Sequence, residues 1–297
     1  MNTPSTIPIC TPELAPVVVS TLAKVRSIAT LPSIAAEIIQ LVNDPHSNVE
    51  QIKRVVESDP ALGTRILKLA NSSFYGVPRK VDSLERAVVM LGLNAVKNTA
   101  IAASLHKVFQ SPKTDLAFDP SQLWIHSIAA ATIARSLAKM TRAAEPDVAF
   151  LTGLIHDVGV MVELQVFRLK FIDVIRQLDA NAQLSFQTAE VANFGATHAA
   201  FGAGLCRQWK FPYHMEQAIE FHHEPLQVPP EQRGLTTLVH VADILAAKLK
   251  AGFTRTVDET NLSPEVLDCL GLSQHALGEL QKQLPADIAE ATALLAG

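Results

Sequence analysis

The sequence predicts an all-α protein built as a multi-helix bundle. Helix start signals recur along its 297 residues, either a Pro in the first turn or a Ser, Asp or Asn at the cap position. Strand-like alternation of apolar and polar residues is nearly absent. Aromatic residues make up only 5% of the chain while Ala and Leu are plentiful, which favours closely packed helices.

Short helices joined by tight turns are predicted in the first third of the chain. Ser47 or Asn48 is placed to cap the second helix, Asp59 to cap the third, and Gly92 to end the fourth. The predicted helices are 31–44, 47–58, 59–71, 83–92 and 93–109. We expect them to form an N-terminal helical subdomain over residues 13–115.

A connector at 110–120 leads into a second helical subdomain, predicted over residues 116–297. Pro146 is expected to begin a helix that contains His156 and Asp157. Other predicted helices are 120–140, 162–178, 186–194, 198–209, 213–224 and 234–252. Two or three further short helices are expected between residues 263 and 295.

Composition and charge restrict the function only mildly. The net charge is −4, with 48% apolar and 18% charged residues, a globular composition. Residues 51–107 hold nine Lys and Arg against four Asp and Glu, a net charge of +5. A solvated helical surface is the ordinary explanation of such a stretch, and a nucleic-acid surface is the alternative.

The cysteines and the apolar segments indicate where the protein works. Cys10, Cys206 and Cys269 are scattered, odd in number and form no CxxC pair, so a reducing compartment is expected. The apolar run 14–23 is short and follows no basic residue, which is untypical of a signal peptide or a membrane span. We therefore expect a soluble, cytoplasmic protein.

Polar residues that are expensive to bury recur inside apolar helices of the second half. Taken singly, each His is most simply a hydrogen-bonded residue of a helix. Together, the five histidines and two aspartates indicate one shared site, and neutral imidazoles with carboxylates suit Fe, Mn, Zn or Ni. The seven residues are His126, His156, Asp157, His198, His222, His223 and Asp243.

At these residues the sequence resembles the HD superfamily of metal-dependent phosphohydrolases. His126, the His156-Asp157 pair and Asp243 match its H…HD…D signature. The resemblance to the HDOD group within it is closer and covers roughly residues 24–250. The segments that carry it are 31–42, 59–76, 83–92, 153–161, Glu190 with His198, 209–212 and the His222-His223 pair.

The resemblance implies an HD-like helical domain that binds one or two transition-metal ions. Iron or manganese is expected first, with zinc or nickel as alternatives. The implied ligands are the seven residues named above, and the family role carried to Asp157 is to bridge two ions. The alternative is a relic site, in which the histidines persist as a hydrogen-bonded polar core without an ion.

Three departures from the related HD-GYP phosphodiesterases bear on activity. Gln122 stands where those relatives carry a ligand Glu, which argues against a third metal. Val160 replaces the Lys of their HDxGK motif and cannot meet phosphate charge. HHEPLQVPP, residues 222–230, replaces their GYP-containing segment. These changes weaken the case for cyclic di-GMP hydrolysis more than the case for metal binding.

Three functions follow as hypotheses. The first is a bacterial signal-transduction module with a retained metal site, acting by contact with a signalling protein partner or by sensing a ligand such as a nucleotide, away from the membrane. The second is an active metal-dependent phosphohydrolase on a nucleotide or cyclic dinucleotide, in which Asp157 acts with a metal-bound water. The third, nucleic-acid binding through Arg65 and Lys68, is the least supported, because residues 59–76 are better explained as bundle core.

Overall fold

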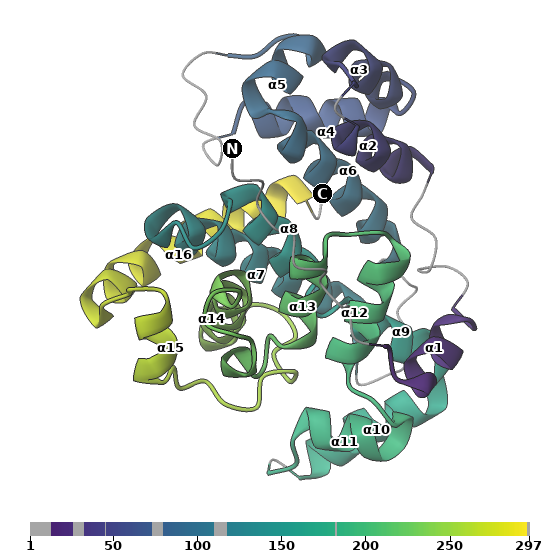
Figure 1. Ribbon diagram of the computed structural model, residues 1–297, viewed down its shortest axis with the longest axis vertical. Coiled ribbons are helices and arrows are strands. Elements are labelled where there is room, and N and C mark those ends of the chain that lie inside the picture. The colour runs from purple at the N-terminus through teal and green to yellow at the C-terminus, as the bar shows by residue number, and fades with distance from the viewer. Residues whose placement is uncertain are drawn as a thin grey trace, which may run out of the picture.

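The all-α prediction is confirmed in every part of the chain that the structure describes. This computed structural model describes residues 13–25, 33–44, 46–72, 80–109, 118–181 and 183–295. All regular elements in these ranges are helical (Figure 1). The predicted connector lies outside the described residues as far as residue 117.

Five helices, α2 to α6, surround an apolar core of their own. They are α2 (Ser33–Asn43), α3 (Val49–Glu57), α4 (Pro60–Ala70), α5 (Leu84–Leu91) and α6 (Leu93–Phe109). Ile38, Ile52 and Ile66 lie fully buried at their centre. Of the two residues proposed to cap α3, Asn48 does so, because its side chain accepts the N–H of Gln51 and the Gln51 side chain accepts the N–H of Asn48.

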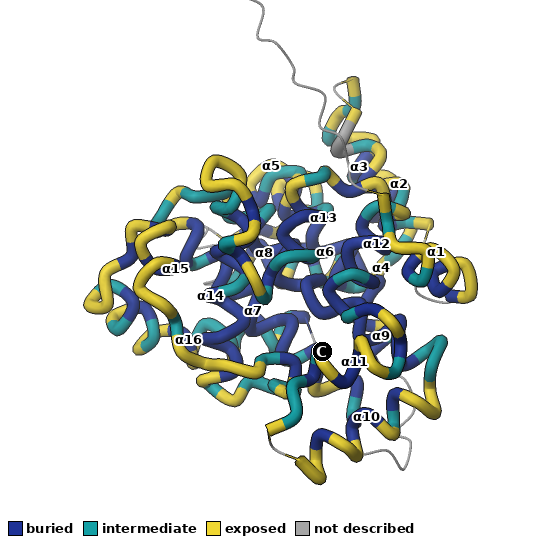
Figure 2. The backbone as a smooth tube through the Cα atoms, turned by 60° about the horizontal axis from the view of Figure 1, so that its bottom comes forward, coloured by how far each residue is buried: buried dark blue, intermediate teal, exposed yellow. Residues whose placement is uncertain are grey.

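The remaining helices form a larger second core around α7. They are α7 (Pro120–Thr141), α8 (Pro146–Ile155), α9 (Val158–Val166), α10 (Arg168–Ala180), α11 (Phe186–Phe194), α12 (His198–Gln208), α13 (Tyr213–Glu220), the 3-10 turn η1 (Pro225–Gln227), α14 (Gly234–Lys248), α15 (Pro264–Cys269) and α16 (Gln274–Leu295). α7 packs against α8, α14 and α16, and most of its residues are buried (Figure 2). Small residues allow this, since a Cβ on Gly153 of α8 would lie 3.0 Å from the Ala130 carbonyl oxygen of α7.

Three helices join the cores. The first is α2, which contributes Ile38 to the first core and Ala35 and Ile39 to the second. α6 contributes Ala100 to the first core and Ile101 to the second. α16, yellow in Figure 1, packs against α7 and also against α4 and α6. α1 (Pro16–Leu22) lies apart from α2 to α6 and packs on α12, with Val18 and Leu22 against Gly204. The proposed division at residues 115 and 116 stays a prediction.

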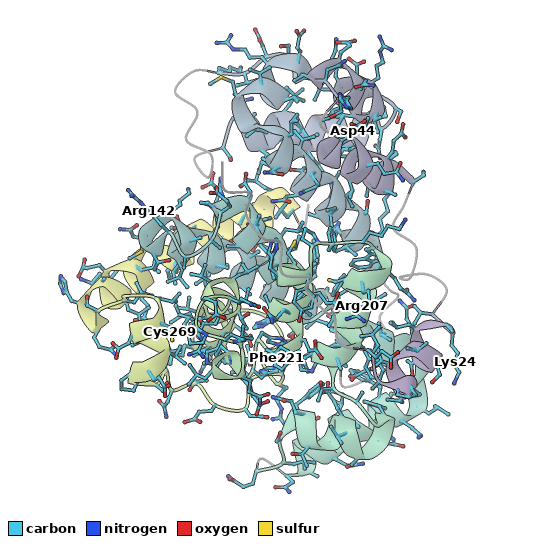
Figure 3. All side chains as sticks on the ribbon, in the orientation of Figure 1. Lys24, Asp44, Arg142, Arg207, Phe221 and Cys269 are labelled. Atoms are coloured by element: carbon cyan, nitrogen blue, oxygen red, sulfur yellow. The ribbon has the colours of Figure 1, made fainter. Side chains whose placement is uncertain are left out.

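Ion pairs also hold neighbouring helices together in the second core. Arg207, labelled in Figure 3, projects from α12, and its Nε donates to Glu216 Oε1 of α13 at 2.9 Å. Glu216 is only 2% exposed. Because a buried carboxylate is expensive without a partner, this pair fixes α13 against α12.

Several helix boundaries differ from the sequence-based expectation, among them the end of α13 at Glu220 instead of the predicted residue 224. α8 ends at Ile155, so His156 and Asp157 lie at a junction rather than within a helix. The helix predicted at 162–178 is divided at Phe167, whose backbone leaves the helical region while its ring stacks on Phe194 at 5.2 Å between centroids. The C-terminal segment holds one short helix and the 22-residue α16, which contains Pro285.

Within the described residues, no single helix is long and apolar enough to cross a membrane. Only α5 and α6 taken together, bent by 110°, reach that length and hydrophobicity. Cys206 and Cys269 are both free thiols, and Cys10 lies outside the described residues.

Candidate metal centre

The seven side chains predicted to share a site converge in the structure. They come from α7, the α8–α9 junction, the first residue of α12, the turn after α13, and α14. Six are fully buried and His223 is partly buried. Their ligand atoms fall into three overlapping groups, in each of which all atoms lie within 4.8 Å of one another. The groups are Asp157 with His198, His222 and His223; His126 with His156 and Asp157; and His156 with His222 and Asp243.

Asp157 lies at the centre of this cluster. Its Oδ1 is 3.2 Å from His198 Nε2, 3.4 Å from His156 Nε2 and 3.6 Å from His222 Nε2. Its Oδ2 faces the other way, 3.8 Å from His126 Nε2. Ligand atoms bound about 2.1 Å from one ion lie roughly 3.0–3.4 Å apart at octahedral or tetrahedral angles. The observed spacings are therefore close to those of ligands around an ion.

A second group of contacts lies on the α7 side of Asp157. His126 Nε2 is 2.8 Å from Asp243 Oδ1, and His156 Nε2 is 3.5 Å from the same oxygen. His126 Nδ1 is 3.3 Å from the Ala251 carbonyl oxygen. The loop reaches α7 this closely because Gly252 has a φ of +68° and no Cβ, which would lie 2.1 Å from a backbone oxygen of α7.

Hydrogen bonds on the far side of three rings orient them toward the centre. His156 Nδ1 donates to the Gly153 carbonyl and His222 Nδ1 to the Ile219 carbonyl, both at 2.7 Å. His198 Nδ1 donates to Glu190 Oε1 at 2.7 Å. A ring that uses Nδ1–H as a donor in its neutral form presents the lone pair of Nε2, the form that a metal needs.

Unpartnered buried atoms provide a direct test of whether these residues suit a metal. His156 Nε2, His222 Nε2 and Asp157 Oδ1 are buried and have no hydrogen-bond partner. Leaving such groups unsatisfied is costly, so native structures rarely contain three together. All three point into one cluster of nitrogen and oxygen donors that suits Fe, Mn, Zn or Ni. The residues fit an ion, and each ion could satisfy several of these atoms at once.

Two helix ends make this geometry possible. Adjacent residues within a helix point about 100° apart, so a continuous helix would separate paired ligands. His156 and Asp157 instead lie where α8 ends and α9 begins, and His222 and His223 follow the end of α13. The His222 and His223 rings come within 3.9 Å of each other, centroid to centroid.

The charges of the cluster shift its protonation strongly. Burial alone would raise the pKa of Asp157, but the imidazoles of His156, His198 and His222 outweigh it and hold that pKa well below its ordinary value. Burial alone would also raise the pKa of Asp243, which His126 and His156 depress far more. Both carboxylates are therefore ionised near pH 7.

Two of the histidines that face these carboxylates, His156 and His198, retain protons more strongly than free imidazole does. Burial lowers the pKa of His156, and the negative charges of Asp157 and Asp243 outweigh it and raise that pKa to about 9. Glu190 and Asp157 likewise raise the pKa of His198 well above its ordinary value against the effect of burial. The carboxylates thus favour positive charge within the cluster, and without a metal ion protons on His156 and His198 supply it.

Three further residues support the cluster, and of these only His240 could be noted from the sequence, because it lies three positions before Asp243 on one helix face. Thr256, in the loop after α14, donates its hydroxyl to Asp157 Oδ2 at 2.9 Å. Glu163 of α9 is fully buried beside Glu190, and burial followed by repulsion from Glu190 raises the pKa of Glu163 well above its ordinary value. His240 donates Nδ1–H to the His222 carbonyl at 2.7 Å and so positions the turn that carries the histidine pair.

The structure also places two of the residues that depart from the HD-GYP phosphodiesterase pattern, Gln122 and Val160. Gln122 is exposed, and it contributes to the site's surroundings only through its carbonyl, which accepts the N–H of Phe253 at 2.9 Å. Val160 is fully buried within α9.

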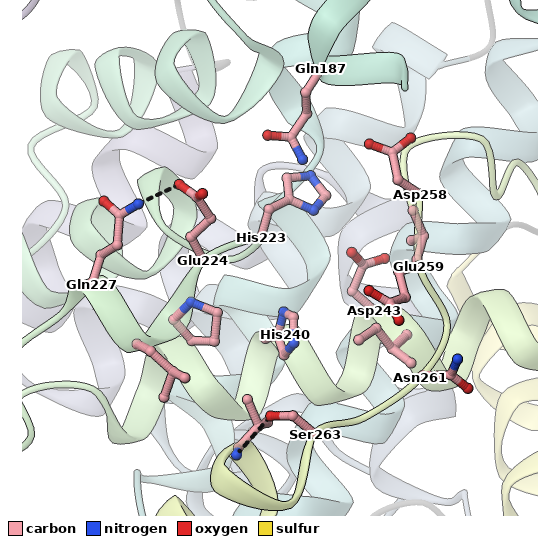
Figure 4. Close-up of a pocket in the computed structure, with 15 residues that line it drawn as sticks. Gln187, His223, Glu224, Gln227, His240, Asp243, Asp258, Glu259, Asn261 and Ser263 are labelled. Carbon is pink, nitrogen blue, oxygen red and sulfur yellow. Dashed lines mark hydrogen bonds between the residues drawn. The ribbon is translucent and has the colours of Figure 1, made fainter. Parts of the chain in front are cut away.

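A pocket of about 560 Å³ opens beside the cluster (Figure 4). It shares His223 and Asp243 with the cluster and is bounded by the turn after α13, by α14 and by the loop that precedes α15. Its volume lies in the range typical of small-molecule sites. The pocket thus reaches two of the seven clustered residues.

Comparisons with known proteins agree with this arrangement. An HDOD domain protein of unknown function from Geobacter sulfurreducens is 26% identical, with a TM-score of 0.78 over 94% of this chain and 97% of its own. A proposed signal transduction protein from Marinobacter aquaeolei VT8 is 26% identical, with a TM-score of 0.73 over 94% of this chain and 64% of its own. An uncharacterized Treponema pallidum (strain Nichols) protein is 26% identical over 223 residues, which are 74% of this chain and 42% of that protein.

This chain therefore spans less than half of the Treponema protein and about two thirds of the Marinobacter one. The family model of the HDOD domain matches residues 28–225, two thirds of the sequence. The matched region contains six of the seven clustered ligands, and Asp243 follows it on α14. On the motifs, the fold and this match together, the chain belongs to the HDOD family.

Proposed function

We propose that this chain is a signal-transduction module whose HD-type centre binds one or two transition-metal ions. The observation that carries the proposal is the convergence of seven imidazole and carboxylate groups, among which three buried ligand atoms have no hydrogen-bond partner. A relic site would be expected to satisfy those atoms with internal hydrogen bonds. A buried ion satisfies them directly.

Asp157 is the residue that we expect to bridge when two ions bind. It is common to two of the three ligand groups, and its two oxygens face different sets of histidines. His198, His222 and His223 would complete one position, and His126, His156 and Asp243 the other. Iron or manganese is our first expectation, because both accept mixed imidazole and carboxylate ligands, with zinc or nickel as the alternatives.

The output of the module would be contact with a signalling protein or the sensing of a small ligand. The pocket beside the cluster supports ligand sensing, since a ligand within it reaches His223 and Asp243 directly. A ligand seated there would also touch the turn between α13 and η1, a surface segment through which its presence could reach a partner.

Metal analysis tests this proposal. Protein reconstituted anaerobically with Fe(II), and separately with Mn(II), Zn(II) or Ni(II), should retain one or two equivalents of ion after desalting. Asp157→Asn should lose most of this metal, whereas Asp179→Asn, a matched change at an exposed position of α10, should retain it. Metal content at background in the wild-type protein under all four conditions would overturn the proposal.

An active phosphohydrolase is the second candidate function. The place of Asp157 in two of the three ligand groups favours it, because two adjacent ions held there could activate a water molecule and polarise a phosphoryl oxygen. Val160 stands against it, since the position of the expected phosphate-binding Lys is a buried apolar side chain. Release of product from cyclic di-GMP or bis(p-nitrophenyl) phosphate by the metal-loaded protein, abolished by Asp157→Asn, would establish this activity.

A further inference from the structure

The pocket beside the metal centre is lined by more carboxylates than the proposed metal-binding residues account for. Besides His223 and Asp243, it is lined by three carboxylates, those of Glu224, Asp258 and Glu259. No Lys or Arg lines it among the residues that the structure describes. An anionic ligand that filled this pocket would therefore meet carboxylates on several sides.

Nothing within the described part of the chain neutralises these three carboxylates. None of its Lys or Arg ion pairs includes Glu224, Asp258 or Glu259. The carboxylates that line the pocket therefore have no Lys or Arg partner in the part of the chain that the structure describes.

The three carboxylates differ in the hydrogen bonds that they accept from the protein. Asp258 begins α11 by accepting the Ser185 hydroxyl at 2.6 Å and the Phe186 N–H at 2.9 Å. Glu224 accepts only the side-chain amide of Gln227, at 2.6 Å. Figure 4 shows Glu224 on one side of His223 and Glu259 on the other, near Asp243. Glu224 and Glu259 are therefore the two carboxylates available to a ligand.

Apolar side chains complete the pocket. Leu226, Ile244, Val257 and Val266 line it together with Pro225. An apolar surface of this kind accommodates a short hydrocarbon segment of a ligand. The neighbouring carboxylates favour a positively charged group at the end of that segment.

We propose that this pocket binds a small zwitterionic ligand, with an oxyanion group at the metal centre and an ammonium or guanidinium group between Glu224 and Glu259. The position of the oxyanion group depends on the metal centre proposed above, whereas the position of the cationic group depends only on the residues that line the pocket. The same charge pattern disfavours a cyclic dinucleotide, which would bring two phosphates and no cation into this space.

Three small phosphates that differ at one end test the charge preference. Their binding to the Mn(II)-loaded protein is measured by calorimetry, with the metal content of each sample determined beforehand. The probes are 2-aminoethyl phosphate, 2-hydroxyethyl phosphate and phosphoglycolate. Two ion pairs with the exposed carboxylates of Glu224 and Glu259 should favour the aminoethyl over the hydroxyethyl compound about fivefold. Phosphoglycolate should bind most weakly.

Variants identify the residues responsible. In the double variant Glu224→Gln with Glu259→Gln, the preference for the amine should disappear while 2-hydroxyethyl phosphate still binds. Glu231→Gln makes the same change of charge at an exposed position outside the pocket and should leave the preference intact. Asp258 is left unchanged because it holds the start of α11.

The outcomes separate this inference from the proposed function. If the protein holds metal but binds the three phosphates equally, binds none of them, or prefers phosphoglycolate, the ligand inference is overturned and the metal centre stands. If the preference for the amine survives in the double variant, the assignment to Glu224 and Glu259 is wrong. If no metal is retained, the metal centre fails together with the oxyanion end of the ligand.

Discussion

At the scale of single residues, the cluster is built from side chains that could not be buried there alone. Asp157 and Asp243 are ionised and 0% and 1% exposed, and each faces imidazoles at 2.8 to 3.6 Å. Such a group of buried charges is tolerated only when each member has a partner of opposite charge. Protons on histidines can provide the positive charge, and so can a metal ion, so the two compete.

This competition makes metal binding depend on pH. Because the pKa of His156 is raised to about 9, the metal-free centre holds at least one proton near pH 7 that an ion must displace. Affinity should therefore rise with pH up to about 9, by up to tenfold per pH unit for each proton released. Calorimetric titration with Mn(II) in buffers of different ionisation enthalpy should show at least one proton released at pH 7. Zero release would contradict the protonated state of the free centre.

Glu163 should make stability depend on pH in the opposite sense from an ordinary paired carboxylate. Its pKa is raised in the folded protein by burial and by Glu190, so above the ordinary Glu pKa, about 4.3, the unfolded chain ionises while the folded one does not. The unfolded state then binds fewer protons, and the stability contributed by Glu163 falls as pH rises, by up to about 1.4 kcal/mol per pH unit.

Glu163→Gln removes this titration and should gain stability over the wild type between pH 5 and pH 8. Urea unfolding at both values measures the difference. Glu231→Gln, at an exposed position, serves as the control and should follow the wild type. An unchanged difference between Glu163→Gln and wild type across this pH range would show that Glu163 is ionised in the folded protein.

At the scale of helices, most of the clustered residues are positioned by helix ends and not by helix interiors. Four of the seven ligands lie just beyond a helix end, and His198 is the first residue of α12. Gly159, two residues after Asp157, allows α9 to approach that start of α12, because a Cβ there would lie 1.9 Å from the His198 carbonyl oxygen. The glycine therefore sets the distance between Asp157 and His198.

Gly159→Ala should separate α9 from α12 and displace His198. We expect a loss of about 3 kcal/mol in the free energy of unfolding, together with weaker metal binding. Gly278→Ala in α16 is the matched control, since no atom lies within 4 Å of its added Cβ, and it should gain roughly 0.5–1 kcal/mol. Chemical denaturation measures both. Equal stabilities of the two variants would show that the helices can separate without penalty.

At the scale of the whole molecule, the centre joins helices that are distant in the sequence. Ligands on α7, α12 and α14 meet at the α8–α9 junction, so an ion bound there would hold the larger core together. α6 and α16 then connect this core to the one formed by α2 to α6.

Metal should therefore raise the thermal stability of the entire chain. At a free concentration one hundred times the dissociation constant, an ion that binds only the folded state adds about 2.7 kcal/mol. For a protein of 297 residues, this corresponds to a rise in Tm of roughly 4 °C. Differential scanning calorimetry with Mn(II) or with EDTA measures the shift, which Asp157→Asn should abolish. An identical shift in Asp157→Asn would place the ion elsewhere.

The sequence by itself determined the fold class and the membership of the cluster. Helical periodicity and caps are local, so Asn48, Asp59 and Gly92 could be recognised from their neighbours alone. The seven clustered residues could be recognised because polar groups within apolar segments are expensive to bury and because they match a known pattern.

Only the tertiary structure decided how those residues meet and what surrounds them. The break at Phe167, the Thr256 hydroxyl on Asp157 and the Glu163–Glu190 pair arise from contacts between segments far apart in the sequence. The charge of the neighbouring pocket has the same origin, since Glu224 and Glu259 lie 35 positions apart and neither is unusual in its local sequence. Local patterns carry no information about such contacts, because the energy that creates them comes from packing and electrostatics across the folded molecule.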